Sequence, residues 1–247
     1  MFARLLVGLD GSVQADVALE QAVVLARRFS AMVIAVYAHE PGASLDRGLA
    51  ERAQFRLVAG GLPGKALEWP GEADQVLAEF AREAELVLVG RRSVTSSGAL
   101  GRTAAALVRV AERCLVVCAG APSPMRTCAV AVDGGESSGR ALELAARFAS
   151  VSGSALHVLH AGDPAAAGDV VGPAEAVLSL QRVSYHTHVR SGRPAEVVAE
   201  LVRELRADVL FAGAHVQRDR PDGPAAVVVS NAEELLTHVP IPVVVQP

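Results

Sequence analysis

Asp10 is the first side chain in the sequence whose type and place suit chemistry. It follows the apolar run that ends at Leu9, and a Gly-Ser pair comes directly after it. In open α/β sheets ligands bind at the carboxyl ends of strands, so we expect a ligand near the loops after Asp10, Ala38 and Gly90. Asp10 could hydrogen-bond a ribose hydroxyl, or it could order the turn between strand and helix. A phosphoacceptor role is less favoured, because such sites need further acids and a lysine nearby.

The histidines are the second group of side chains with chemical potential. Six of the seven fall in the second half of the chain: His157, His160, His186, His188, His215 and His238. His186 and His188 are two residues apart on an expected strand, so both imidazoles point to one face, a spacing compatible with a metal ion. No acid or thiol of matching spacing completes a site. We therefore interpret the pair as an exposed part of a strand and predict no metal site.

Charge and hydropathy exclude two classes of partner. The net charge is −4 and the basic residues are scattered, so no patch of one sign is available to bind nucleic acid or an anionic membrane. No apolar stretch approaches the roughly 20 residues that span a bilayer. Lys65, the only lysine, follows the turn-like run 60–64, where we expect it to be exposed. We predict neither a nucleic-acid nor a membrane partner.

The cysteines indicate the compartment. Cys114, Cys118 and Cys128 are odd in number and lack Cys-x-x-Cys spacing, which favours reduced thiols buried as small apolar side chains. The first residues run directly into a strand-like segment and show no secretory signal pattern. We therefore expect a cytoplasmic protein.

A repeat with a constant offset organises the chain. The segment that ends in Asp10 returns as the segment that ends in Asp133, 123 positions later, and 84–90 matches 207–213 at the same offset. The linker between the copies contains two prolines, which interrupt regular structure. We predict one domain over residues 1–121 and a second over 126–247.

Within each copy, short apolar runs alternate with segments of helical period, which is the pattern of βαβ units. The expected strands are 4–9, 32–38, 55–59, 85–90 and 114–118 in the first copy and 127–132, 154–160, 182–189, 207–213 and 242–245 in the second. Several of these runs are apolar on both faces, as a sheet covered by helices on both sides requires. The predicted fold is α/β, with two tandem doubly wound five-stranded parallel-sheet domains.

Several segments in this order resemble the universal stress protein family over nearly the whole chain. They are the Val-Gly-Leu-Asp-Gly-Ser start at 7–12, the strand end at 36–41, the Gly-Arg-Pro-Ala-Glu run at 192–196, the strand at 207–210 and the ending at 239–245. Family members divide into those that bind ATP and those that do not. The binders carry Gly-x-x-Gly after the fourth strand, a spacer, and then Gly-Ser or Gly-Thr, because backbone without side chains lets phosphates approach a helix N-terminus. His160 matches the histidine that often closes the second strand in this family.

The resemblance places an altered ATP signature in the first copy. Gly90 is followed by Ser93 in place of the second glycine, and Gly98 and Gly101 come at a shortened spacing. Arginines and hydroxyls in the loop could still hold phosphates, or they could simply be solvated. The cofactor-binding residues implied for an adenine nucleotide with Mg²⁺ are Leu9, Asp10, Ala38, Gly90, Ser93, Gly98, Gly101, Arg102 and Thr103.

The second copy departs further from the signature. Val216 and Val229 stand at glycine positions, where branched side chains would occupy the space of phosphate oxygens. Asp219 and Asp222 would repel a phosphate. We predict no ATP binding in this copy.

Three functions remain open at this stage. No nucleophile, base and orienting group are assembled in the sequence, which favours a non-catalytic stress-response protein that modulates unidentified protein partners. The alternative is a stress protein that binds ATP in the first copy and hydrolyses it slowly, for which Asp10 is the only well-placed acid. A phosphoaspartate or electron-transfer domain of flavodoxin-like topology would lack the terminal Pro-Val-Val-Val strand.

The final strands suggest an internal dimer. In universal stress proteins the last strand often pairs with its counterpart in a second subunit, and exposed sheet edges need such cover. The two copies could imitate that dimer within one chain, with a homodimer as a further arrangement. We predict that 114–118 and 242–245 lie side by side.

Overall fold

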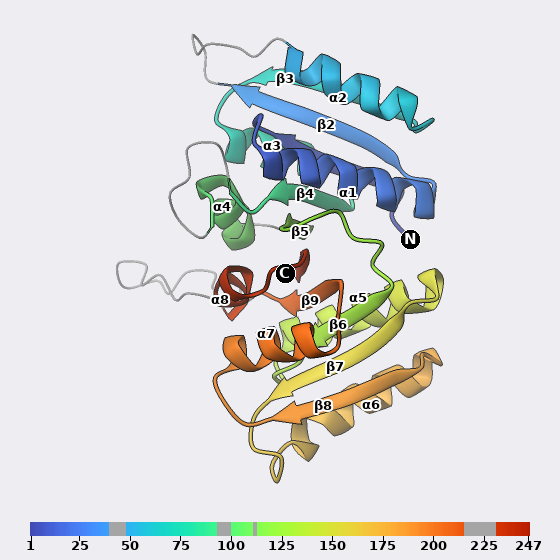
Figure 1. Cartoon of the computed structure of the whole chain (residues 1–247), viewed down its shortest axis with the longest axis vertical. Helices are drawn as coiled ribbons and strands as arrows, with labels where there is room; N and C mark the ends of the chain where they lie inside the picture. The colour runs from blue at the N-terminus through green and yellow to red at the C-terminus, as the bar shows by residue number, and fades with distance from the viewer. Residues whose placement is uncertain (40–47, 93–99, 111–112, 215–230) are drawn as a thin grey trace. The chain divides into compact units, whose positions relative to one another are not determined.

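The computed structural model describes residues 1–39, 48–92, 100–110, 113–214 and 231–247. The chain divides into two compact units (Figure 1). The first contains 1–107, 111–124 and 241–244, and the second contains 108–110, 125–240 and 245–247. The expected pairing of 114–118 with 242–245 stays a prediction.

The first unit alternates strands and helices. Its elements are β1 (Arg4–Leu9), α1 (Val13–Phe29), β2 (Met32–His39), α2 (Gly48–Ala59), β3 (Gly64–Pro70), α3 (Ala73–Ala81), β4 (Leu86–Gly90), α4 (Arg102–Val110) and β5 (Cys114–Cys118). The strand order is β3-β2-β1-β4-β5, and each of these neighbouring pairs is parallel. The order reverses between β1 and β4, so the crevice for a ligand is expected at their carboxyl ends.

The second unit repeats this plan. Its elements are β6 (Thr127–Ala131), α5 (Glu136–Ser152), β7 (Ala155–Ala161), α6 (Gly168–Gln181), β8 (Tyr185–Arg190), α7 (Pro194–Glu204), β9 (Val209–Gly213) and α8 (Asn231–His238), and β10 (Val243–Gln246) follows. The strand order is β10-β9-β6-β7-β8, with β6 parallel to β7 and β9. The α/β, mostly parallel fold in tandem is therefore confirmed.

The core is mainly aliphatic, in agreement with an aromatic content of only 4%. Strands β4 and β5 are buried along almost their whole length, which places apolar side chains on both faces of the sheet. The cysteines are buried free thiols, and burial raises the pKa of Cys114 to about 12 and also raises the pKa of Cys118. In the part of the chain that the structure describes, no helix has the length and apolar character needed to cross a membrane.

The predicted strand at 55–59 is wrong. These residues belong to α2, whose buried side chains Leu49, Ala53 and Leu57 recur every four residues, which is the spacing of one helix face. The strand is instead β3, which contains Lys65; that side chain is exposed as expected, but it lies in a strand and not in a turn. Because β3 is an edge strand with few buried residues, it lacks the apolar signal of its neighbours.

One carboxylate at the entry to each unit fixes the start of the first strand. Glu85 Oε2 accepts hydrogen bonds from the backbone N–H groups of Ala3 and Arg4, at 2.6 and 2.7 Å. In the second unit Asp208 accepts from Arg126 and Thr127, at 3.0 and 2.9 Å. Glu85 and Asp208 are 123 positions apart, so the sequence repeat extends to individual hydrogen bonds.

Candidate functional site

A pocket lies at the carboxyl ends of β1, β2 and β4 in the first unit, at the point where the strand order reverses. Its volume is about 40 Å³. The residues that line it are Gly8, Leu9, Asp10, Ala15, Val36, Ala38, Ala73, Leu77, Val89, Gly90, Gly101, Thr103 and Ala104. Small and apolar side chains dominate this surface, and Asp10 is the acid among them.

Asp10 orders the turn that leads into α1. Its Oδ1 accepts a hydrogen bond from the backbone N–H of Ser12 at 2.9 Å, and Gly11 between them has φ 78°. Ser12 then caps α1, because its Oγ accepts from the N–H of Ala15 at 3.0 Å. Of the two roles proposed for Asp10, turn ordering is therefore visible, and Asp10 is also exposed at the edge of the pocket.

Gly90 is required by helix packing. A Cβ atom at this position would lie 2.7 Å from the backbone carbon of Gln14 in α1, closer than real Cβ atoms approach. Gly213 has the same role in the second unit, where a Cβ would overlap the backbone of Ser137 in α5. The first glycine of the signature is thus explained by packing alone, and it carries no evidence for a phosphate by itself.

Two arginines, Arg91 and Arg92, follow Gly90, which lines this pocket. The N–H of Arg92 donates to Gln14 Oε1 at 2.7 Å, which fixes the loop against α1. Burial lowers the pKa of Arg91, and the neighbouring charge of Arg92 lowers it further. Both effects disfavour the charged form of Arg91.

The amide of Gly101 and the side chain of Arg102 already have partners. Gly101 donates its N–H to the carbonyl oxygen of Arg91 at 2.7 Å. A guanidinium nitrogen of Arg102 lies 3.4 Å from Glu72 Oε2, and the Arg102 side chain is largely exposed. Thr103, in the first turn of α4, lines the pocket. Of these three residues, Thr103 is the one whose side chain is placed to meet a ligand.

The second unit has an equivalent pocket at the carboxyl ends of β6, β7 and β9, with a volume of about 60 Å³. Its lining residues are Ala131, Val132, Asp133, Ser138, Leu159, Ala161, Pro194, Val198, Ala212, Gly213 and Leu235. Asp133 repeats the turn of Asp10, because its Oδ1 accepts from the N–H of Gly135 at 2.9 Å. Ser138 takes the place of Ala15 and is buried, with its Oγ donating to the carbonyl oxygen of Gly135 at 2.9 Å.

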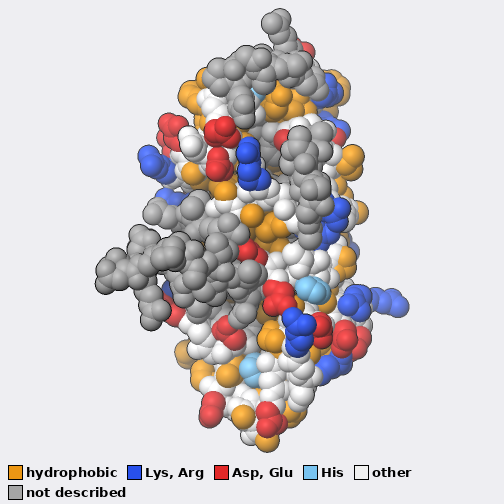
Figure 2. Space-filling model, turned by 90° about the vertical axis from the view of Figure 1, so that its left-hand side faces the viewer, with side chains coloured by type: hydrophobic (Ala, Val, Ile, Leu, Met, Phe, Trp, Pro, Cys, Tyr) orange, Lys and Arg blue, Asp and Glu red, His pale blue; other side chains and the backbone are white. Residues whose placement is uncertain are grey.

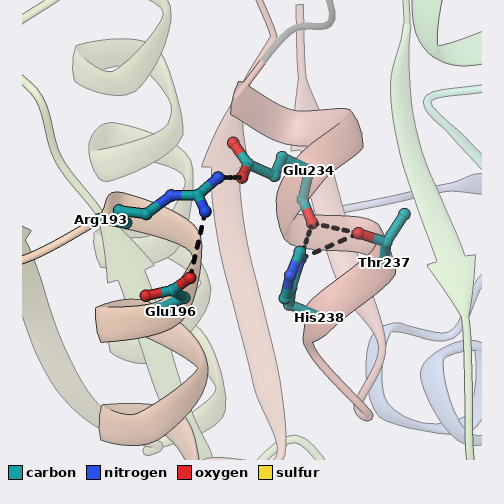
Figure 3. Close-up of polar contacts among 5 residues, drawn as sticks. All are labelled: Arg193, Glu196, Glu234, Thr237 and His238. Carbon is teal, nitrogen blue, oxygen red and sulfur yellow. Dashed lines mark hydrogen bonds and ion pairs between the residues drawn. The ribbon is translucent and has the colours of Figure 1, made fainter.

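An ion pair joins the start of α7 to α8, beside the pocket residues Pro194 and Leu235 (Figure 3). Arg193 precedes α7 and lies 3.1 Å from Glu234 and 3.3 Å from Glu196. Farther along α8, Nδ1 of His238 lies 2.8 Å from the carbonyl oxygen of Glu234. The first unit joins the corresponding helices with Glu72 and Arg102, so the acid and the base have exchanged positions.

The surface agrees with the charge pattern of the sequence. On the face shown in Figure 2, basic and acidic side chains of the described residues are interspersed.

His160, at the end of β7, is buried with its Nδ1 2.9 Å from the carbonyl oxygen of Val132. Its ring therefore contributes to the core beside the second pocket.

Comparisons with known proteins agree with this architecture. The sequence profile described as "Universal stress protein family" matches residues 1–118, 125–182 and 174–247. The chain belongs to this family. The fold is similar to that of a universal stress protein from Archaeoglobus fulgidus DSM 4304, with a TM-score of 0.78 and 17% identity over 98% of this chain and 97% of that one.

A functionally unknown protein from Pseudomonas aeruginosa PAO1 is similar as well, with a TM-score of 0.74 and 17% identity over 99% of this chain and 92% of that one. At this identity the likeness shows the fold. A comparison with curated proteins finds no match. Membership of the universal stress protein family, repeated in tandem, supports a stress-response function.

The predicted nucleotide residues of this universal stress protein are only partly brought together. Six of them line the first pocket: Leu9, Asp10, Ala38, Gly90, Gly101 and Thr103. Arg102 lies at the rim in its ion pair with Glu72. Ser93 and Gly98 fall outside the described residues, as do the predicted obstacles to ATP in the second unit, Val216, Asp219, Asp222 and Val229.

Sequence reasoning did not single out Ser138 or Arg193. Both stand at positions where the two copies differ, Ser138 against Ala15 and Arg193 against Glu72. If the two copies had been aligned at the expected starts of helices and ends of strands, these two differences would have been visible in the sequence.

Proposed function

We propose that the chain is a non-catalytic stress-response protein of the universal stress type. The observation that carries this proposal is the use of the two pocket acids. Asp10 and Asp133 each accept a hydrogen bond from the backbone of the turn that follows, as structural turn residues do. Among the described residues that line either pocket, no His, Cys or Lys accompanies these acids as a base or nucleophile.

A second candidate function is the binding of an adenine nucleotide in the first unit. Six of the nine residues implied by the family signature line one pocket, at the place where open α/β sheets bind ligands. The cationic Arg91 and Arg92 lie next to it, and the first turn of α4 begins beside it. Asp10 and Thr103 would hold the nucleotide or its Mg²⁺ through oxygen atoms, and the bound ion would neutralise phosphate charge.

Two features weaken this second candidate. The Gly101 N–H, which the signature would direct at a phosphate, donates to Arg91. Arg102 is exposed and faces Glu72. Binding through this pocket would therefore be weaker than an intact signature provides. In the second unit we propose no ATP binding, on the basis of the valines and acids in its signature.

Calorimetric titration of ATP with Mg²⁺ into the full chain tests both candidates. Ala38 and Ala161 are equivalent positions, each at the end of the second strand of its unit and each lining a pocket. Ala38→Leu fills the first pocket and Ala161→Leu fills the second. If the first unit binds nucleotide, saturable heat disappears in Ala38→Leu and persists in Ala161→Leu.

The other outcomes are equally informative. If ATP with Mg²⁺ gives no heat with the wild-type chain, the nucleotide-binding candidate fails and the role in binding protein partners remains. Loss of binding in Ala161→Leu alone would contradict the assignment of nucleotide to the first unit. Release of inorganic phosphate from ATP well above a buffer blank, abolished by Ala38→Leu, would overturn the non-catalytic proposal.

A further inference from the structure

Three histidines gather on neighbouring strands of the second unit, away from its pocket. His157 lies on β7 in register with His186 on β8, and His188 follows two residues later on the same face of β8. The rings of His157 and His186 are stacked, with centroids 5.6 Å apart and planes at 25°. The ring of His188 lies 5.2 Å from that of His157. The sequence showed two of these imidazoles together, and the pairing of β7 with β8 adds the third.

Two of the imidazoles aim nitrogen atoms at each other. Nδ1 of His157 and Nε2 of His188 are 3.0 Å apart, a distance at which one ring donates a hydrogen bond to the other. Two nitrogen ligands on one tetrahedral zinc ion stand about 3.3 Å apart, given zinc–nitrogen bonds of about 2.0 to 2.1 Å. If the donating ring moves its hydrogen to its other nitrogen, a small ring movement would therefore let both facing nitrogens bind one metal ion.

The rings of this cluster are accessible. His157 and His188 are half-buried and His186 is exposed, so an ion can reach the cluster from solvent.

Charged groups beyond the rings come from β8 and α7. Arg190 is paired with Glu204 at 2.8 Å and with Glu200 at 3.4 Å. This network is exposed and largely screened, and it presents two carboxylates against one guanidinium next to the imidazoles. Arg190 nevertheless lowers the pKa of His188 more than Glu204 raises it, so the two imidazole nitrogens must hold a divalent cation against a net repulsion.

We propose that His157 and His188 bind a divalent transition-metal ion of the zinc, nickel or copper type through Nδ1 and Nε2. Imidazole donors suit these ions, whereas Mg²⁺ and Ca²⁺ prefer oxygen ligands. Within the described ranges no group of three or more His, Cys, Asp or Glu side chains is arranged to hold a metal ion. The site is accordingly a two-imidazole site whose remaining positions are open to water. His186 supports the ring of His157 by stacking and is not a ligand.

The test is calorimetric titration of Zn²⁺ into the full chain without an affinity tag, with Mg²⁺ as the control ion. We expect saturable binding of one Zn²⁺ and no heat from Mg²⁺. His157→Gln and His188→Gln should each weaken Zn²⁺ binding by about tenfold or more. His238→Gln, which removes an exposed histidine on α8, should bind as the wild type does.

A further variant separates ligand from support. His186→Phe removes the nitrogens and retains an aromatic ring to stack on His157, so it should leave Zn²⁺ binding within about twofold. Loss of binding in His186→Phe would overturn the two-imidazole assignment. Absence of saturable Zn²⁺ binding in the wild type, or equal binding in wild type and His188→Gln, would overturn the proposal altogether. Far-UV circular dichroism of each variant shows whether a loss of binding reflects a loss of fold.

Discussion

The pockets of the two units share their framework and differ at their rims. Both have an Asp that orders the first turn, a glycine with positive φ after it, and a glycine at the end of the fourth strand that admits the first helix. The units differ in one lining residue and in one ion pair near the pocket. Ser138 stands where the first unit has Ala15, and the pair Arg193–Glu234 replaces Glu72–Arg102.

The comparison separates structural residues from candidate ligand residues. Features common to both units are explained by turns, caps and close packing, so they would be present whether or not a nucleotide binds. Features that differ alter the charge and the polarity of the pocket mouth. A family signature in the sequence contains both structural residues and candidate ligand residues. Gly90, for example, is a glycine of the phosphate-binding signature, although helix packing alone explains it.

The largest effect is expected at the two packing glycines. Gly213→Ala should lower the free energy of unfolding by about 2 to 3 kcal/mol and Gly90→Ala by about 1 to 2, because an added Cβ meets backbone atoms that have no rotamer to change. The contact is closer at Gly213, hence the order. Urea denaturation followed by circular dichroism measures both values.

Gly139→Ala is the matched control for these variants. Gly139 lies within α5, and a Cβ there meets nothing within 4 Å. The substitution should stabilise the chain by about 0.5 to 1 kcal/mol, because glycine is a poor helix former. If Gly90→Ala were as stable as the wild type, the packing explanation of this glycine would fail.

The carboxylates that fix the first strand of each unit should give a smaller effect. Glu85→Ala and Asp208→Ala each remove an acceptor for two backbone N–H groups, at an expected cost of about 1 kcal/mol each. Both carboxylates are half-buried, so the two costs should be similar. Thermal and urea unfolding of the two variants measure the cost in each unit.

The Glu85 carboxylate also predicts a dependence on pH. Burial acts to raise its pKa, but the hydrogen bonds from Arg4 and Ala3 outweigh this and leave the pKa below the usual value. A lowered folded-state pKa stabilises the fold above the unfolded-state pKa of about 4.5, and this stabilisation is lost as pH falls through the folded value. The stability difference between wild type and Glu85→Gln should be present at pH 7 and shrink below pH 4. A constant difference across this range would contradict the charge argument.

Most of the fold could be predicted from the sequence. The repeat at a constant offset of 123 residues shows the two copies, and buried strands such as β1 and β4 are recognisable as continuous apolar runs. The helix α2 and the edge strand β3 could not, since Phe55 and Val58 lie next to buried positions and are themselves exposed. The site was less accessible to sequence reasoning. The neighbourhood of His157 and His188 depends on strand register, and the helix contact of Gly90 depends on the packing of α1, neither of which a linear pattern contains.

The smallest effect concerns the caps of the first helix in each unit. Ser12 caps α1 through its side chain, whereas Gly135 occupies the N-cap position of α5 with no side chain to accept a bond. Ser12→Ala should cost about 0.5 kcal/mol, and Gly135→Ser should add a few tenths of a kcal/mol. Both are measured as shifts in the urea midpoint. The Ser138 hydroxyl donates to the Gly135 carbonyl at the start of α5. If Gly135→Ser destabilised the chain, this hydrogen bond would already stabilise the helix start, and a side-chain cap at position 135 would be incompatible with it.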